Sequence, residues 1–378
     1  MTSESILIAL VAAVAATALV LAVVVFRRQR RLILTATGDL QPTSPSRDLV
    51  HEVQERGDLV AFVANPTKPD VAGLRDAVRA ACEDRDLPEP IWFETTAEDP
   101  GVGQTREAVR RGADVVVAVG GDGTVRAVAE ALVGSGIPMG LVPMGTGNLL
   151  ARNLDIPLSD PEAAIRIALT GRNRSIDVGW LTLDGPDQDP DAPRTEHLFL
   201  VIAGLGFDAA MVADTDATLK ARVGWMAYFL AGVRHLHGTR SKVHIRLDDR
   251  PPATARLRSL LVGNCGRLPG GITLLPDALV DDGWLDIAAI DTRGGLVGWA
   301  QLFGEVVLQG YGVRTGLPAK IGRIDHARAR RIRLLVPAGE HVQVDGEVLG
   351  RATEVDVRVD PGVLVMRVQA DAPEPSAA

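Results

Sequence analysis

The sequence has little cysteine and no excess of positive charge. Its 378 residues include only two cysteines, Cys82 and Cys265, which lie far apart, so we expect neither a disulfide framework nor a cysteine-rich zinc site. Lysine and arginine total 40 against 48 aspartates and glutamates, which gives a formal net charge of −8. No strongly basic domain is present, and the composition therefore argues against a nucleic-acid partner. The lysine-containing Walker A motif is also absent, so backbone amides would have to hold any nucleotide phosphates.

A long uncharged segment lies near the amino terminus, from Ile6 to Phe26. As a helix it would be about 31 Å long, which matches the hydrocarbon core of a bilayer. Four arginines follow this segment directly, whereas Glu4 is the only charged side chain before it. A cleaved signal peptide normally carries its basic residues before the apolar run. The segment therefore predicts a single-pass transmembrane anchor over residues 1–31, with the rest of the protein on the cytoplasmic side of the cell membrane.

The sequence after this segment divides into regions of different character. Residues 32–57 are rich in Pro, Ser and Thr and are expected to form a flexible linker. From 58 to 174, apolar runs alternate with amphipathic ones, which predicts a parallel α/β sheet covered on both faces. Residues 175–370 contain many alternating strand-like segments and predict a β-rich, sandwich-like second domain, whose last strand could return to the first. The tail, 371–378, is expected to be disordered.

The expected elements can be placed along the chain. In the first domain, strands are expected at 58–66, 90–96, 113–121 and 137–145, with helices at 71–86, 103–112 and 124–136. In the second, strands are expected at 175–183, 196–206, 242–249, 255–264, 284–290, 330–336, 341–348 and 353–360. Helices are expected there near 219–236 and 296–309. The first of these could line a lipid pocket, contact the membrane interface or simply pack on the sandwich.

The segment Gly120–Thr124, "GGDGT", stands between an apolar strand and an amphipathic helix. Such a turn presents backbone N–H groups beside the positive end of the helix dipole, which suits a phosphate group. Glycines allow the backbone to approach an anion closely, and Asp122 could hold a metal ion or order a polar network. The alternative is a tight turn in which Asp122 only caps the helix. Because "ANP", "ETT" and "PMGTGN" end strands at the same sheet edge, a ligand site is favoured there.

Two acidic segments occur in the β-rich region. In "VDGE", Asp345 and Glu347 flank a glycine between alternating apolar positions, so both could project from one edge. An ordinary hairpin is the alternative, because Asp-Gly is a common pair in a type I′ turn. The segment 276–287, "PDALVDDGWLDI", holds more carboxylates than a strand turn requires. Either a site for a hard cation or a plain Asp-Asp-Gly turn fits this pattern.

Six segments, in this order and spacing, resemble the diacylglycerol kinase family of lipid kinases, which includes sphingosine and ceramide kinases. They are Asn65–Pro66, Gly120–Thr124, Pro143–Asn148, Gly204–Ala209, Pro276–Ile287 and Val344–Glu347. The resemblance implies a two-domain cytoplasmic enzyme, with an α/β nucleotide-binding domain and a β-sandwich-like lipid-substrate domain. It also implies ATP and Mg²⁺ as cofactors and a lipid substrate taken from the membrane. Because related enzymes are often dimers, a homodimer is expected.

The resemblance assigns roles to individual residues. Nucleotide contacts are implied for Asn65, Thr95, Gly120, Gly121, Asp122, Gly123, Thr124, Gly145 and Thr146, with Asp122 near the catalytic magnesium. Turn or cap hydroxyls are the alternative for the two threonines outside "GGDGT". Glu347 is implied as the general base, with Asp345 as a metal ligand or orienting partner, although these two roles could be exchanged. A structural magnesium is implied at the Asp282 carboxylate and the carbonyl oxygens of Leu279 and Trp284.

Two departures from the family pattern affect the nucleotide region. Arg126 and Ala127 stand where many relatives have an Asn-Glu pair, and Leu149 stands where many have an aspartate. The leading hypothesis is an ATP-dependent kinase that converts diacylglycerol to phosphatidate at the inner face of the cell membrane. A kinase of a sphingoid or other lipid, an NAD kinase-like enzyme and a non-catalytic, membrane-tethered nucleotide sensor remain as alternatives.

Overall fold

The computed structural model describes residues 57–186, 194–206, 240–268, 272–292 and 322–370. The described residues all belong to one compact unit. The predicted anchor, the linker up to residue 56, the helices near 219–236 and 296–309 and the tail lie outside the described ranges. Within those ranges, no helix is long and apolar enough to cross a bilayer.

The first part of the described chain is an α/β layer structure. Four parallel strands lie in the order β4-β3-β1-β2, and their bounds are β1 (Val60–Ala64), β2 (Ile91–Glu94), β3 (Val115–Gly120) and β4 (Met139–Pro143). The helices are α2 (Val71–Glu83), α3 (Val102–Arg110), α4 (Asp122–Leu132), α5 (Leu149–Asn153) and α6 (Pro161–Thr170). Strands β1, β3 and β4 are buried at every residue, which confirms the prediction of a sheet covered on both faces.

Helices α5 and α6 were not expected from the sequence. The start of α6 nevertheless has a clear local cause, because the Asp160 side chain accepts a hydrogen bond from Ala163 N at 2.9 Å. Pro161 then occupies the first helical position, where its missing N–H has no partner to lose.

The second part is rich in strands. They are β5 (Arg172–Asp184), β6 (His197–Phe199), β7 (Ile202–Leu205), β8 (Ser241–Leu247), β9 (Ala253–Leu257), β10 (Ser259–Gly263), β11 (Arg267–Leu268), β12 (Ile272–Thr273), β13 (Leu285–Thr292), β14 (Gly322–Ala329), β15 (Arg331–Val344) and β16 (Glu347–Val368). Strand β14 was not predicted. The predicted strands 196–206 and 255–264 are each two strands, because β9 pairs with β8 whereas β10 pairs with β7 and β13.

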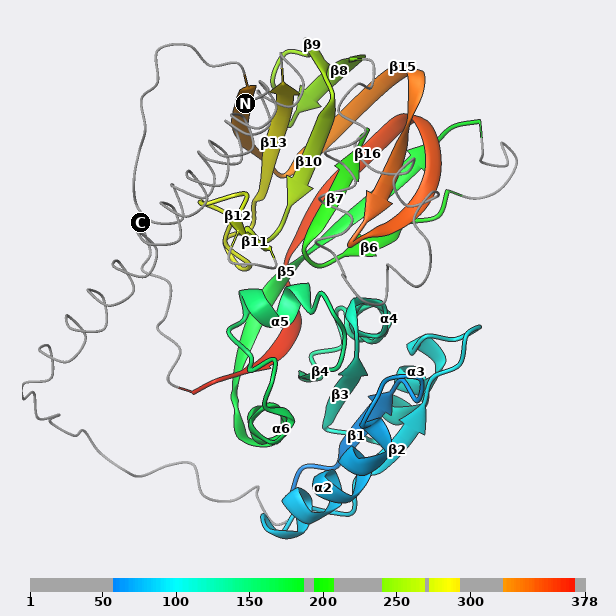
Figure 1. The fold of residues 1–378 in the computed structure, drawn as a ribbon, viewed down its shortest axis with the longest axis vertical. Coiled ribbons are helices and arrows are strands. Elements are labelled where there is room, and N and C mark those ends of the chain that lie inside the picture. The colour runs from blue at the N-terminus through cyan, green and yellow to red at the C-terminus, as the bar shows by residue number, and fades with distance from the viewer. Residues whose placement is uncertain (1–56, 187–193, 207–239, 269–271, 293–321, 371–378) are drawn as a thin grey trace, which may run out of the picture. The chain divides into compact units, whose positions relative to one another are not determined.

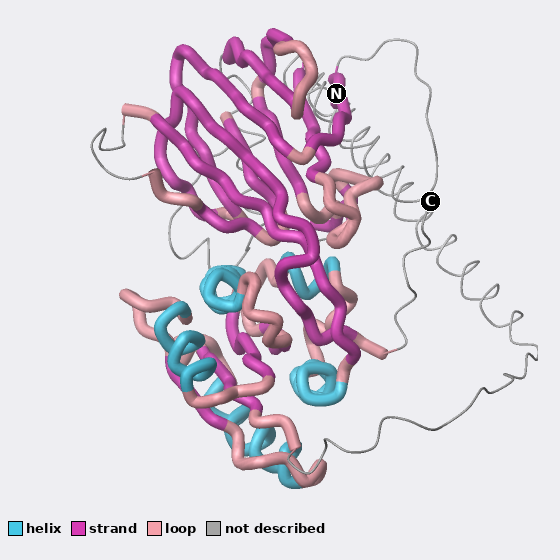
Figure 2. The backbone as a smooth tube through the Cα atoms, turned by 180° about the vertical axis from the view of Figure 1, so that it is seen from behind, coloured by secondary structure: helices cyan, strands magenta, loops and turns pink. Residues whose placement is uncertain are grey.

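One mixed sheet of 14 strands joins the two parts, and only β11 and β12 form a separate pair in the described ranges. Strand β16 pairs with β5 from Glu354↔Asp184 to Val368↔Arg172, and it also meets β4 in parallel at Met366↔Met139. Figures 1 and 2 show β5 and β16 running from the β-rich part into the α/β part. The last strand therefore returns to the first sheet, so the two parts share hydrogen-bonded backbone.

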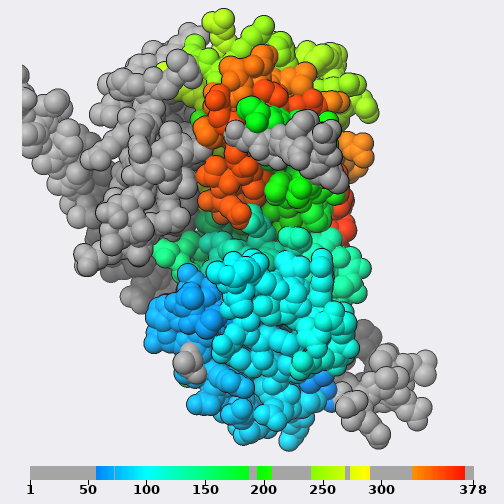
Figure 3. Space-filling model, turned by 90° about the vertical axis from the view of Figure 1, so that its right-hand side faces the viewer, coloured from blue at the N-terminus to red at the C-terminus, as the bar shows by residue number. Residues whose placement is uncertain are grey.

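In the β-rich part, β15 buries one face along its first half. On β15, Ile332, Leu334 and Val336 are buried and the residues between them are exposed, the alternation of a strand with one solvated face. Their cluster of buried side chains includes Val355 and Val357 of β16. In the space-filling view, the orange and red residues of these strands lie against green residues of the strands before them (Figure 3). This core fixes the end of β15, where the "VDGE" turn follows.

Candidate active site

Two glycine-rich turns touch at the carboxyl ends of β3 and β4. Met144 N donates to Gly120 O at 2.8 Å. A Cβ atom on Gly145 would lie only 2.6 Å from Gly121 Cα, which is closer than a side chain can approach backbone. Glycine is therefore required here for close packing of the "GGDGT" and "GTGN" turns. The predicted convergence of these two turns is present in the structure.

Asp122 joins these turns through its carboxylate. Its oxygens accept hydrogen bonds from Asn148 N at 3.0 Å and Leu149 N at 2.6 Å. Asn148 has a left-handed backbone (φ 48°), and its side chain bonds both the N–H and the C=O of Gly145. Burial raises the pKa of Asp122, and the backbone donors oppose that shift. These contacts form the polar network considered for Asp122, and its place near a catalytic magnesium stays a prediction.

The first turn of α4 has space beside its backbone N–H groups, where an anion could bind. Gly121 precedes the helix with extended backbone and provides no side-chain cap, and Gly123 is exposed with nothing within 4 Å of a Cβ placed on it. Lys68 Cε lies 3.9 Å from the position of a Cβ on Gly121. Lys68 is half-buried and has no ion-pair partner among the described residues. Sequence analysis missed this lysine, although its place three residues after Asn65 puts it at the same sheet edge.

The other predicted nucleotide residues also lie at the strand ends. Asn65 N donates to Val119 O at 2.9 Å, and its side chain accepts hydrogen bonds from both the N–H and the hydroxyl of Thr67. Thr95 is buried after β2, where its N–H donates to Ala64 O at 2.9 Å. Thr124 is buried against Gly120, whereas Thr146 is exposed in the second turn. Asn65 thus orders the loop that carries Lys68.

The "VDGE" turn is a two-residue hairpin. Asp345 and Gly346 both have positive φ values, 46° and 87°, as a type I′ turn requires. The Asp345 carboxylate is buried and accepts three backbone N–H groups, from Leu200 at 2.8 Å, Val201 at 3.0 Å and Ile202 at 2.9 Å. Burial raises the pKa of Asp345 to about 6 despite these donors. This arrangement interrupts the predicted strand 196–206, because these amides bond the side chain.

The hairpin corrects one expectation about its two acids. They do not project together from one edge: Asp345 points into the protein, whereas Glu347 begins β16 with 60% of its side chain exposed. Glu347 forms an ion pair with Arg126 of α4, and Arg126 Nη1 donates to Val344 O at 3.4 Å. Since Arg126 lies four residues after Asp122, one helical turn separates the "GGDGT" carboxylate from the residue that binds Glu347. Arg126 is one of the departures from the family pattern.

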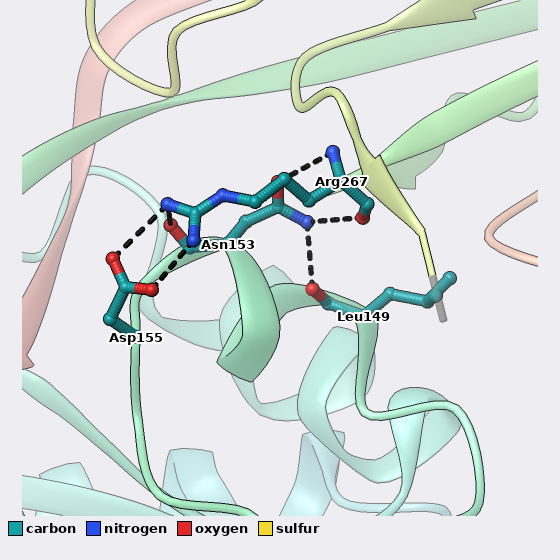
Figure 4. A network of polar contacts seen from close by, with 4 residues as sticks. All are labelled: Leu149, Asn153, Asp155 and Arg267. Atoms are coloured by element: carbon teal, nitrogen blue, oxygen red, sulfur yellow. Dashed lines mark hydrogen bonds and ion pairs between the residues drawn. The ribbon is translucent and has the colours of Figure 1, made fainter. Parts of the chain in front are cut away.

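Leu149, the other departure, is held by a network of polar contacts (Figure 4). Its side chain is buried, and its carbonyl oxygen accepts a hydrogen bond from Asn153 Nδ2 at 2.8 Å. The Asn153 side chain also bonds the N–H and C=O of Arg267 on β11, and the Arg267 guanidinium pairs with Asp155 at 2.6 Å. The buried Leu149 side chain holds α5 in place. Because Leu149 N also donates to the Asp122 carboxylate, α5 in turn holds the "GGDGT" turn at the start of α4.

The predicted structural magnesium site contains an arginine. Asp282 forms an ion pair with Arg328 of β14, and its other oxygen accepts Trp284 N at 3.0 Å. Arg328 Nε also lies 3.3 Å from the buried Asp286 carboxylate, whose pKa is raised by burial to about 6. The Leu279 side chain is exposed. No group of three His, Cys, Asp or Glu residues placed to hold a metal occurs in the described ranges. Arg328 therefore occupies one side of the Asp282 carboxylate, and a structural Mg²⁺ held by this carboxylate with the carbonyl oxygens of Leu279 and Trp284 stays a prediction.

Asp177 holds the same turn from the side of β5, and sequence analysis missed it. Its oxygens accept Gly283 N at 2.6 Å and Gly362 N at 2.8 Å, and its N–H donates to Val280 O at 2.7 Å. Burial raises the pKa of Asp177. Gly283 and Gly362 both have positive φ values, 74° and 65°. The signal in the sequence was a lone acid in the apolar run "SIDVGWLTL".

Comparisons with known proteins agree with this architecture. Residues 60–181 match the family model for the diacylglycerol kinase catalytic domain, and residues 201–368 match that for the YegS C-terminal NAD kinase beta sandwich-like domain. The chain therefore belongs to the diacylglycerol kinase family of lipid kinases, and it is a phosphotransferase.

Individual relatives match most of the chain. A protein of Pseudomonas aeruginosa named "Probable lipid kinase YegS-like" is 32% identical over 310 residues, covering 80% of this chain and 92% of its own. A protein of Mycobacterium tuberculosis named "Diacylglycerol kinase" is 31% identical over 243 residues, covering 64% of this chain and 72% of its own. The crystal structure of a diacylglycerol kinase from Bacillus anthracis has the same fold, with a TM-score of 0.64, 22% identity and coverage of 82% of this chain and 97% of the other.

Proposed function

We propose that the protein transfers the γ-phosphoryl group of ATP to the hydroxyl of diacylglycerol and produces phosphatidate. The observation that carries this proposal is the contact between Arg126 and Glu347. It brings the one exposed acid of the "VDGE" turn to the helix that begins at "GGDGT", where a phosphate could bind. Similarity to the mycobacterial protein named diacylglycerol kinase supports the choice of acceptor.

The chain's own groups suit nucleotide phosphates. Backbone N–H groups in the first turn of α4 lie at the positive end of the helix dipole, and Gly123 leaves the approach to them open. The Lys68 side chain beside Gly121 adds a cation at the same place. Magnesium bound with ATP would neutralise phosphate charge. Asp122 holds the two turns together, so its substitution should misplace these donors.

Glu347 supplies the general base. In the proposed step, the lipid hydroxyl loses its proton to the Glu347 carboxylate while its oxygen bonds to the γ-phosphorus of ATP. The bond from that phosphorus to the β–γ bridging oxygen breaks, and ADP leaves. The exposure of Glu347 allows a lipid headgroup to reach it. We further propose that residues 6–26 anchor the enzyme in the cell membrane, with its catalytic parts in the cytoplasm, and that it forms a homodimer.

An acceptor screen tests this function. The full-length chain in detergent micelles would be incubated with labelled ATP and, separately, diacylglycerol, sphingosine, ceramide or NAD. We expect labelled phosphatidate from diacylglycerol and a loss of about 10²- to 10⁴-fold in kcat for Glu347→Gln, the range for removal of a general base. Labelling of NAD or of a sphingoid lipid instead would refute diacylglycerol as the acceptor. Nucleotide binding without transfer to any acceptor would indicate a sensor.

A further inference from the structure

Arg126 contacts the "VDGE" hairpin at two points. Nη2 pairs with Glu347 and Nη1 donates to Val344 O, so the planar guanidinium bridges the side chain after the turn and the backbone before it. A guanidinium can do this because its donors lie in a fixed fork, which a lysine does not offer. Only 20% of the Arg126 side chain is exposed. The hairpin is therefore tied to α4 by a largely enclosed cation.

Glu347 has little else to fix its position. It follows a glycine with φ 87°, and most of its side chain faces solvent. Within the described parts of the chain, Arg126 is its only ion-pair partner. An exposed glutamate loses considerable rotamer entropy when held in one geometry, so without a partner its carboxylate would sample several positions. A general base needs to lie within hydrogen-bond reach of the hydroxyl, and such sampling would reduce the productive fraction.

The groups around Arg126 leave it available for Glu347. The neighbouring Asp345 carboxylate already accepts three backbone N–H groups. His197, on β6, is half-buried, and burial together with the charge of Arg126 lowers its pKa. His197 is therefore neutral near pH 7 and adds no second cation beside Glu347.

We propose that Arg126 is a positioning residue for Glu347, holding its carboxylate toward the first turn of α4. This inference depends on the proposed function, because it assigns Glu347 the role of base. Arg126 acts through Glu347 and does not bind the phosphates itself. The sequence signal is the departure at this position: a long, charged side chain can reach the hairpin, whereas the family's shorter asparagine would not span the same distance.

A double-mutant cycle tests this role. In full-length protein, Arg126→Met, Arg126→Lys, Glu347→Gln and the double variant Arg126→Met/Glu347→Gln would be compared for kcat, for nucleotide Kd and for melting temperature. We expect Arg126→Met to lower kcat about 10- to 100-fold, as a misplaced catalytic group does, with nucleotide Kd unchanged within about twofold. Arg126→Lys should recover part of the loss. The double variant should be no slower than Glu347→Gln alone.

A matched control is Arg333→Met, which removes an arginine–glutamate pair with Glu354 between β15 and β16, away from the glycine turns. It should leave kcat unchanged. Nucleotide Kd weakened in Arg126→Met by the same factor as kcat would show that Arg126 binds the phosphates, and the inference would be wrong. Additive losses in the double variant would equally overturn it. Absence of lipid phosphorylation by the unmodified protein would instead refute the proposed function, so the two failures are distinguishable.

Discussion

Replacing Arg328 by methionine should make the stability of the protein respond to magnesium. In the structure, Arg328 pairs with Asp282 and lies 3.3 Å from the buried Asp286 carboxylate. Methionine keeps the apolar stem and removes the charge, so two neighbouring carboxylates lose their cation. The turn would then present hard oxygen ligands without a positive partner, which is a favourable environment for Mg²⁺.

The expected loss of stability follows from burial. Surface ion pairs contribute about 0–1 kcal/mol, whereas removing one partner of a buried pair costs about 3–5 kcal/mol. The Arg328 side chain is 40% exposed but that of Asp286 only 9%, so an intermediate loss of about 2 kcal/mol is expected. For the unit of 323 residues (56–378), whose unfolding entropy is about 0.7 kcal/mol/K, that corresponds to a fall in Tm of about 3 °C.

Thermal unfolding with and without Mg²⁺ measures both parts of this prediction. The unmodified protein should keep the same Tm in EDTA and in millimolar Mg²⁺. Arg328→Met should melt lower in EDTA and regain part of the loss when Mg²⁺ is added, since a ligand that binds only the folded state raises stability. Arg110→Met, on α3, should show no magnesium response, because its partner Glu107 keeps its ion pair with Arg111. A fall in Tm of the unmodified protein in EDTA would refute the assignment of Arg328 as the cation of this turn.

Three further predictions concern the glycine turns and the hairpin. Lys68→Met should raise the KM for ATP about tenfold, as expected for one charge-assisted phosphate contact of about 1.4 kcal/mol. Lys242→Met, which replaces an exposed lysine on β8, should not raise it. Gly145→Ala should weaken nucleotide binding at least tenfold in a direct binding assay, because its Cβ would lie 2.6 Å from Gly121 Cα; unchanged affinity would show that the turns can separate. Burial raises the pKa of Asp345 from 3.8 to about 6, so the folded protein binds this proton more readily and the free energy of unfolding should rise as pH falls from 7 to 5. Chemical denaturation of Asp345→Asn should lack that rise, and an equal pH dependence in the variant would contradict the assignment.

Local pattern predicted the four parallel strands and the first three helices of the α/β part, but not α5 and α6. The buried valines of β3 and the helical spacing after Gly123 specify their elements without distant contacts. The β-rich part was predicted less well. The strand expected over 196–206 is interrupted because backbone N–H groups of this segment donate hydrogen bonds to the Asp345 carboxylate. Asp345 lies more than 140 residues away along the chain. No local property of that segment announces such a long-range bond.

The candidate site shows the same division. The contact between the two glycine turns followed from parallel strands ending at one edge, and the structure contains it. The separate orientations of Asp345 and Glu347 could not be predicted, because they depend on which strand lies behind the hairpin. The pairing of Asp282 with Arg328 also escaped prediction: β14 follows β13 only after a long insertion, and the register that opposes Asp286 to Arg328 is a property of the sheet.

Two departures from the family pattern, Ala127 and Leu149, both remove negative charge near the nucleotide region. Leu149 removes a carboxylate from the neighbourhood of Asp122, and Ala127 removes a second acid from α4. The Lys68 side chain places a cation close to the "GGDGT" turn, whereas the charge of Arg126 is paired with that of Glu347. Fewer anions beside such a cation lower the repulsion that a triphosphate would meet, but they also leave fewer oxygen ligands for a metal. If the Lys68 ammonium replaces part of the metal's role in binding, nucleotide affinity should depend only weakly on Mg²⁺, while the transfer step, where charge develops on the phosphates, should still require it.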